Sequence, residues 1–304
     1  MRRRSFGSYS AVMATGILSI GAGDLDLPAL SSLLLAAALA AMLWLGAADL
    51  LALLRRRAEP ASPPVDLFTW VAATGVVAAR LDRGELQLLL AAAAALGWLA
   101  AWVALIVALS SLRRAPFDQA RGSWLLLVVA PQSLAILAAR LLPGLAVPLW
   151  VFGLALYVPL IALIVRRLPA KLEPDYWIMM GALAISTLAA VEVLGSSALA
   201  VAAGLLIWTL ASAWLPLLFL AATPWRGLPR YDPLRWSLVF PIGMYGAASH
   251  ALYVAGGGSF AFLDAVAKIA FAAGLLAWLL SFSSWVASRR PPHAAAAPRP
   301  AQQS

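Results

Sequence analysis

Cysteine does not occur in the chain, and histidine occurs only twice, at His250 and His293. The lack of thiols excludes a disulfide framework, a thiolate metal site and a cysteine nucleophile. No histidine-rich metal motif, Walker loop or paired-aspartate motif is present, and Gly195-Ser196 does not form a nucleophile elbow. The sequence therefore predicts no metal and no cofactor.

Charge is also scarce, because Asp, Glu, Lys and Arg together fill 12% of the positions while hydrophobic residues fill 63%. Such a balance is far from that of a soluble globular domain. Uncharged runs cover residues 86–112, 141–165, 193–225 and 236–263. Each run exceeds the roughly 20 residues that a bilayer-spanning helix needs, so the sequence predicts a multi-pass membrane protein.

The net charge of +9 is explained by the spacing of the basic residues. Of the 22 Lys and Arg residues, 18 fall into six groups of three in alternate loops: Arg2–Arg4, Arg55–Arg57, Arg113/Arg114/Arg121, Arg166/Arg167/Lys171, Arg226/Arg230/Arg235 and Arg289/Arg290/Arg299. Basic residues are retained on the cytoplasmic side of a membrane. We therefore expect a cell (inner) membrane protein with both termini cytoplasmic, and we expect no nucleic-acid partner. The start of the chain also resembles a signal peptide with a cleavage point near Ala22, but it shares a pattern with the third span that a cleaved leader would not need.

Spans placed between alternate basic groups give ten helices. Their expected ranges are 6–22, 29–54, 66–81, 86–111, 122–142, 145–166, 174–192, 197–222, 234–255 and 261–287. Residues 1–288 would form one transmembrane domain, and residues 289–304, rich in Pro and Ala, a disordered cytoplasmic tail.

The odd-numbered spans differ from the even-numbered ones. The even spans are long and, as in residues 33–54 and 86–109, consist almost wholly of Leu, Ala, Val and Trp, which suits contact with lipid. Each odd span carries a small or helix-breaking element one to two turns in: Thr15-Gly16, Thr74-Gly75, Pro131-Gln132, Gly181 and Pro241-Gly243. These elements recur at intervals of roughly 50 to 60 residues, and such repetition predicts five helical hairpins.

Irregular helices are tolerated inside a membrane where they face protein or a water-filled cavity. The expected fold is therefore an all-α membrane protein whose odd helices form an inner ring around a central pore, with the even helices outside. A solid bundle that uses glycine for close helix packing is the alternative.

Four segments resemble one protein family over nearly the whole chain: AVMATGILSIGA at 11–22, FTWVAATGVVAARL at 68–81, YWIMMGALAIS at 176–186 and WSLVFPIGMYGAAS at 236–249. This is the tellurite-resistance and C4-dicarboxylate transporter family, which includes plant slow anion channels and fungal malate and sulfite exporters. The resemblance implies ten helices in five hairpins, a homotrimer with one pore in each subunit, and transport of small anions. It also implies a phenylalanine gate, which matches Phe240 beside Pro241, with Tyr245 as the alternative.

Arginines on two inner helices are candidates for attracting the anions. Arg80 and Arg140 both occur in the sequence AARL, near the ends of the third and fifth spans. Charges within a membrane are costly and are often functional, so the two residues could form a positive vestibule. Alternatively, each side chain extends to the outer interface.

Neutral donors on the inner helices would suit weak, successive anion sites. The candidates are Thr15, Ser19, Thr74, Gln132, Ser133, Ser186, Thr187, Tyr245 and Ser249, although Ser and Thr hydroxyls also bond to their own helix. His250 and Glu192 are candidate proton sites or interfacial residues. Asp264 and Lys268 have the spacing of an ordinary helical pair.

The residues leave the anion open. The resemblance favours C4-dicarboxylates such as malate, with chloride, nitrate, sulfite or tellurite as alternatives. An intramembrane enzyme and a membrane protein without transport activity are the other classes. Anion flux in liposomes would distinguish a transporter from both.

Overall fold

The computed structural model describes residues 7–55, 65–81, 84–111, 120–169, 171–221 and 231–289. These residues form α-helices, with three short 3₁₀ helices at the starts of inner helices and no strand among them. The basic groups at 2–4, 113–114 and 226–230 and the expected tail beyond residue 289 lie outside these ranges.

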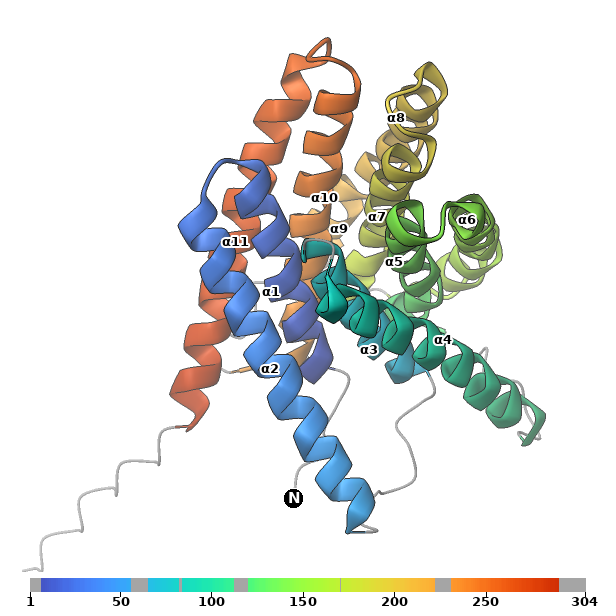
Figure 1. The fold of residues 1–304 in the computed structure, drawn as a ribbon, viewed down its shortest axis with the longest axis vertical. Helices are drawn as coiled ribbons and strands as arrows, with labels where there is room; N and C mark the ends of the chain where they lie inside the picture. Colours follow the sequence, from blue (N-terminus) through green and yellow to red (C-terminus); the bar gives the residue numbers. More distant parts are fainter. Residues whose placement is uncertain are drawn as a thin grey trace, which may run out of the picture.

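Five helical hairpins make up the described chain, as the sequence predicted (Figure 1). The pairs are α1 (Gly7–Asp24) with α2 (Pro28–Leu54), α3 (Val65–Arg80) with α4 (Glu85–Ser111), α5 (Leu126–Leu141) with α6 (Pro143–Val165), α7 (Ile178–Leu194) with α8 (Ala198–Ser212), and α10 (Trp236–Ala255) with α11 (Ala261–Arg289). The 3₁₀ helices η2 (Gly122–Leu125), η3 (Pro174–Trp177) and η4 (Pro233–Arg235) lead into α5, α7 and α10.

The first helices of the hairpins form a closed ring. Contacts run from α1 to α3, from α3 to α5, from α5 to α7, from α7 to α10, and from α10 back to α1. Burial follows this order: 78% of the residues in the best apolar windows of the α5 and α7 spans are buried, against 17% in those of α4 and α6. The inner and outer rings predicted from the sequence are thereby confirmed.

Eight helices of the described chain are long and apolar enough to cross a membrane, and α3 is a shorter apolar helix. Large apolar side chains of the outer helices, such as Leu43, Leu96 and Leu220, are exposed on the surface of the bundle. Apolar side chains in these positions are stable only against lipid or another apolar partner.

The expected helix over 197–222 is divided into α8 and the short α9 (Leu215–Ala221), with a turn at Ala213 and Trp214. Proline causes this break, because Pro216 has no N–H and its ring conflicts with a carbonyl one turn earlier. The prediction of one continuous eighth helix was wrong in this detail, although α8 and α9 together still make one apolar span.

Candidate functional site

A cavity of about 700 Å³ opens at one end of the inner ring. All five inner helices line it with residues from their C-terminal halves, for example Ile20, Val76, Ile136, Leu188 and Ala247. The five helices are therefore parallel, with their C-terminal ends around the cavity mouth and their N-terminal ends at the opposite side of the bundle.

Each inner helix contributes one ionisable residue to the wall of this cavity: Asp24 from α1, Arg80 from α3, Arg140 from α5, Glu192 from α7 and His250 from α10. Four of these were candidates in the sequence, and the structure brings them together. With His250 neutral, the formal charges of the five residues cancel. We call these five residues the rim.

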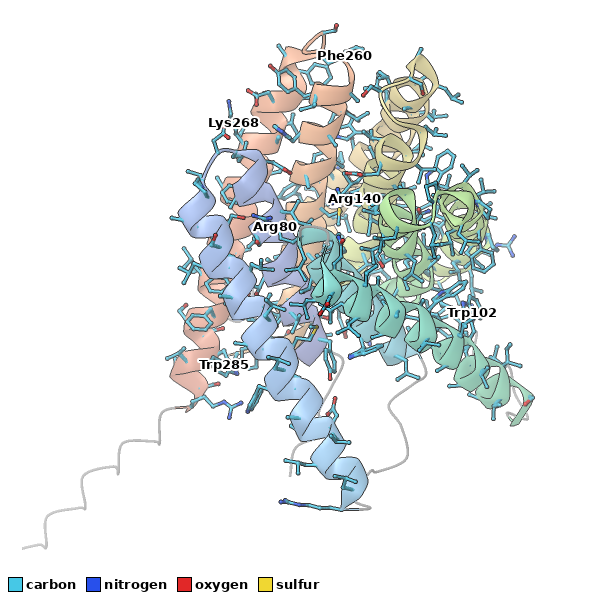
Figure 2. All side chains as sticks on the ribbon, viewed as in Figure 1. Arg80, Trp102, Arg140, Phe260, Lys268 and Trp285 are labelled. Carbon is cyan, nitrogen blue, oxygen red and sulfur yellow. The ribbon has the colours of Figure 1, made fainter. Side chains whose placement is uncertain are left out.

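The two arginines of the rim are held in different ways. Arg80 donates from Nε and Nη2 to Ser31 Oγ on α2, at 3.1 and 2.8 Å, and Ser31 in turn exchanges hydrogen bonds with Ser19. Arg140 donates two hydrogen bonds to the Glu192 carboxylate, of 2.8 and 3.3 Å, and one from Nη1 to the Ala79 carbonyl at 3.0 Å. Figure 2 shows the two arginines at neighbouring points of the bundle. Arg140 is thus paired with an acid, whereas the hydrogen bonds of Arg80 go to a neutral hydroxyl.

Below the rim the cavity wall is mainly apolar. Its side chains include Ile20, Val76, Ile185 and Met244, while Ser133 supplies a hydroxyl. The Ser133 hydroxyl donates to the Ala130 carbonyl of its own helix at 2.7 Å. Anions in the cavity would therefore meet charge at the rim and little polarity further in.

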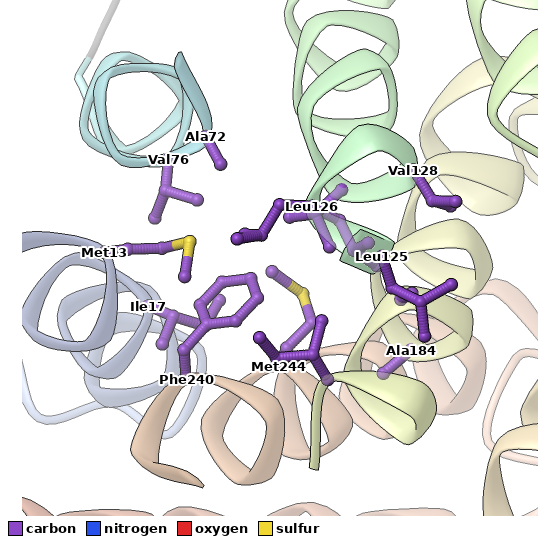
Figure 3. Close-up of a cluster of buried hydrophobic side chains, with 14 of the residues drawn as sticks. Met13, Ile17, Ala72, Val76, Leu125, Leu126, Val128, Ala184, Phe240 and Met244 are labelled. Atoms are coloured by element: carbon purple, nitrogen blue, oxygen red, sulfur yellow. The ribbon is translucent and has the colours of Figure 1, made fainter. Parts of the chain in front are cut away.

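Phe240 lies beneath the floor of the cavity. Figure 3 shows its ring at the centre of the inner helices, among the side chains of Met13, Ile17, Leu126 and Met244. The Phe240 side chain is fully buried. Because Met244 belongs both to this cluster and to the cavity wall, Phe240 and its neighbours close the cavity toward the N-terminal ends of the inner helices. We call this cluster the plug.

Tyr245, the alternative candidate for the gate, points away from the plug. Its ring stacks on Trp208 of α8, with ring centroids 5.4 Å apart, and its hydroxyl shares a hydrogen bond of 2.7 Å with Ser212. Of the two aromatic residues, only Phe240 lies on the axis of the inner ring.

Most of the polar residues expected along a pore are directed at their own helix or at the outer ring. Five hydroxyls donate to the carbonyl four residues earlier in their own inner helix: those of Thr15, Thr74, Ser186, Thr187 and Ser249. Indole N–H groups of outer helices donate to Thr15 and to Ser249, and Gln132 donates to the Trp150 carbonyl on α6 at 3.0 Å. None of these six residues lines the described cavity.

The small and proline elements do not interrupt the inner helices, since α5 runs through Pro131 and α10 through Pro241. The glycines instead allow neighbouring inner helices to approach closely. A Cβ atom on Gly75 would lie 2.7 Å from Ser133 Oγ, and one on Gly181 would lie 2.9 Å from Pro241. Similar contacts join Gly16 to Val76 and Gly243 to Ile17.

Two features of the structure were not anticipated. Asp24 was placed in a loop, although it lies four residues after Ile20 and so on the same face of α1. At the opposite end of the bundle, Arg121 donates to both carboxylate oxygens of the buried Asp175 and contacts Glu173.

The tie between Arg121 and Asp175 joins the starts of α5 and α7. The Asp175 carboxylate also accepts from the Ser123 backbone N–H at 3.2 Å. Partial burial by itself lowers the pKa of the Arg121 guanidinium, but hydrogen bonds and attraction from Asp175 and Glu173 outweigh it and raise that pKa further above its usual range. Arg121 therefore stays charged at any physiological pH.

Within the described residues no group of three His, Cys, Asp or Glu side chains could hold a metal ion. The fold defines a multi-pass membrane protein with a ring of five inner helices around a cavity that is closed at its inner end. The profile of the voltage-dependent anion channel family matches residues 4–286, which is nearly the whole chain. The chain belongs to this family.

Two curated relatives carry little functional information. Both are described as an uncharacterized membrane protein of Mycobacterium tuberculosis, one from each of two strains, and each is 36% identical over 120 residues. The alignment covers 33% of this chain and 60% of the relative. The chain thus spans less than two thirds of the length of these relatives.

Proposed function

We propose that the protein transports small anions across a cell membrane through the central passage of the inner ring, with C4-dicarboxylates such as malate as its first substrates. One observation carries the proposal: a member of an anion channel family has a cavity of about 700 Å³ that is lined by all five inner helices and closed at its floor by an aromatic plug. A membrane protein that only scaffolds a partner would need neither a cavity lined by all five inner helices nor the plug beneath it.

Inorganic anions are the alternative substrates. Chloride, nitrate, sulfite or tellurite would be attracted by the same guanidinium groups that would attract a carboxylate. A dicarboxylate has the additional possibility of contacting Arg80 and Arg140 together, since both line one cavity. This pairing favours malate as the first substrate to test.

Reconstitution in liposomes tests the proposal. Labelled malate uptake and chloride current should be measured on the same preparation, each with and without a pH gradient. Malate uptake above protein-free vesicles supports the dicarboxylate assignment, and current carried by chloride alone supports the inorganic alternative. If neither anion moves, the protein is not the proposed transporter, and an intramembrane enzyme becomes the leading alternative.

Proton coupling would involve His250 and Glu192, which we retain as candidate proton sites. Both line the cavity, where the other charged groups facing them are Asp24, Arg80 and Arg140.

Charge changes at the rim should alter flux in opposite directions. Arg80→Gln and Arg140→Gln each remove one positive charge and should lower anion flux, whereas Glu192→Gln removes the acid paired with Arg140 and should raise it. The differences should be largest at low ionic strength, because at about 0.1 M salt charges are screened within about 10 Å. Asp264→Asn is a suitable control, because Asp264 pairs with Lys268 on the outer helix α11 and does not line the cavity. Equal flux in all four variants at low salt would remove the rim from the transport path.

Orientation follows from the basic residues at the end of the bundle opposite the cavity. Arg55, Arg166 and Arg289 stand at the ends of outer helices, and Arg121 and Arg235 stand before inner helices. We propose that this end and both chain termini are cytoplasmic, so that the cavity opens to the other side. Reporters fused before residue 1 and after residue 304 should both indicate the cytoplasm. A reporter signal from the opposite compartment at either end would contradict the proposed topology.

The resemblance also supports a homotrimer with one passage in each subunit. The exposed apolar faces of the outer helices are available for such contacts or for lipid. Chemical crosslinking in native membranes followed by mass determination distinguishes a trimer from a monomer.

A further inference from the structure

Three buried donor groups near the N-terminal ends of the inner helices have no acceptor among the residues that the structure describes. They are the hydroxyls of Thr69 on α3 and Ser237 on α10, and Nη1 of Arg235 in η4. The residues are 0%, 1% and 6% exposed, respectively. A guanidinium can only donate, and buried polar groups without partners are rare because they lose their hydration without compensation.

Thr69 and Ser237 differ from the other hydroxyls of the inner ring. Thr15, Thr74 and Thr187 each donate to the carbonyl four residues earlier, which is the ordinary arrangement in a membrane helix. Thr69 and Ser237 make no such bond. Their hydroxyl protons are therefore available to a group that is not part of the described chain.

Helical register places the two hydroxyls next to the plug. Thr69 precedes Ala72 by three residues and Ser237 precedes Phe240 by three, so each lies one turn away on the same helix face. Phe240 is the centre of the plug, and Figure 3 shows Ala72 in the same cluster of buried side chains. The hydroxyls thus lie on the side of the plug that faces away from the cavity.

The electrostatics of this end favour negative charge. All five inner helices begin here, and the N-terminal end of a helix dipole is positive. Among the acids at this end, Asp175 and Glu173 are engaged by Arg121, and Asp232 caps η4 by accepting from the Leu234 backbone N–H. Arg235, by contrast, has no carboxylate partner within the described residues, and η4 packs against α1 and η3.

We propose that Thr69, Arg235 and Ser237 form an anion-binding site directly on the N-terminal side of the plug, which takes one small inorganic anion or one carboxylate group. The proposal rests on the proposed function, because it places this site in the same passage as the cavity. An anion bound there would accept hydrogen bonds from the three unpaired donors. Movement of Phe240 would connect the site to the cavity.

Thermal unfolding of the purified full-length protein tests the site without any transport measurement. Sodium chloride, nitrate or malate replaces sodium isethionate at constant ionic strength, and the rise in melting temperature gives an apparent dissociation constant. The wild type should be stabilised in a saturable manner. Thr69→Val, Ser237→Ala and Arg235→Gln should each weaken this binding about tenfold or more, because each removes a donor to a charged acceptor. Stronger stabilisation by chloride and nitrate indicates an inorganic site, and stronger stabilisation by malate indicates a carboxylate site.

Thr187→Val and Ser281→Ala are the matched controls. Both hydroxyls are buried and donate to their own helix, so these variants should keep the wild-type dissociation constant. In isethionate, Thr69→Val should melt at a higher temperature than the wild type because it removes an unsatisfied donor, whereas Thr187→Val should not.

Unchanged anion binding in both Thr69→Val and Ser237→Ala would overturn the site, and these two variants decide the matter if Arg235→Gln fails to fold. Binding that depends on these residues in a protein without flux would leave the site standing and would contradict the transport proposal. Flux in a protein whose anion binding is unaffected by the variants would support the transport proposal and overturn the site.

Discussion

Phe240→Ala should raise the anion conductance of the reconstituted protein by about tenfold or more, since it removes the ring that fills the centre of the plug. The Phe240 ring lies among Met13, Ile17, Leu126 and Met244, and no other aromatic ring is labelled at this centre (Figure 3). A hydrophobic constriction blocks ions by steric closure and by excluding water. Truncation to alanine would let water and anions pass between the cavity and the other side.

The same substitution should also reduce stability, because loss of a buried phenylalanine costs about 3–5 kcal/mol. Phe68→Ala is the matched control: Phe68 is equally buried, but its ring packs edge-on against Trp102 of the outer helix α4, at 5.5 Å. Single-channel recording in planar bilayers, together with a thermal scan, separates the two effects. If both variants lose stability and neither gains current, then Phe240 is only a core residue and the passage is closed elsewhere.

Asp175→Ala should destabilise the protein by about 1–3 kcal/mol, the typical cost of leaving a buried hydrogen-bond donor without its acceptor. Asp175 is 1% exposed and accepts hydrogen bonds from Arg121 Nε at 2.7 Å and from the Ser123 backbone N–H. Without its carboxylate, the Ser123 backbone N–H loses its acceptor, and the Arg121 guanidinium, which is 40% exposed, keeps only Glu173. The tie between η2 and η3, and with it the spacing of α5 and α7, would be lost.

Asp264→Ala provides the comparison for this loss. Asp264 forms an i,i+4 pair with Lys268 that is largely exposed, and such pairs contribute little to stability because water screens them. The melting temperatures of the two variants, measured in the same detergent, should therefore differ clearly. Similar melting temperatures would show that Asp175 is not a structural tie.

Much of the fold could be predicted from the sequence, because the bilayer restricts which residues can occupy each position. Three of the four uncharged runs fall on the outer helices α4, α6 and α8, and the fourth falls on the inner helix α10. The alternation of basic groups assigned α3 as a span although it is short. Recurrent elements such as Thr74-Gly75 and Pro241-Gly243 marked the helices that lie inside. These signals have two physical causes: charge is costly against lipid, and the glycines let neighbouring inner helices pack closely.

Side-chain direction could not be predicted with the same success. Thr15 and Ser249 occur on inner helices, but their hydroxyls face tryptophans of the outer ring. The direction of each side chain depends on the rotation of its helix about its own axis. Asp24 belongs to the cavity only because α1 continues beyond the expected end at residue 22. The pairing of Arg140 with Glu192 depends on contact between α5 and α7, and the separate spans give no information about it.

The closure of the inner ring between α10 and α1 has a consequence for the biogenesis of the protein. A chain is synthesised from its N-terminus, so α1, α3, α5 and α7 enter the membrane before the helix that completes the ring exists. Until then, Asp24 and Glu192 border a gap on the side of the nascent bundle, where lipid or the insertion machinery must meet them. The enclosed cavity therefore forms in one late step, when the fifth hairpin inserts, and a chain arrested before α10 would expose polar cavity wall to the bilayer and become a target for membrane proteases.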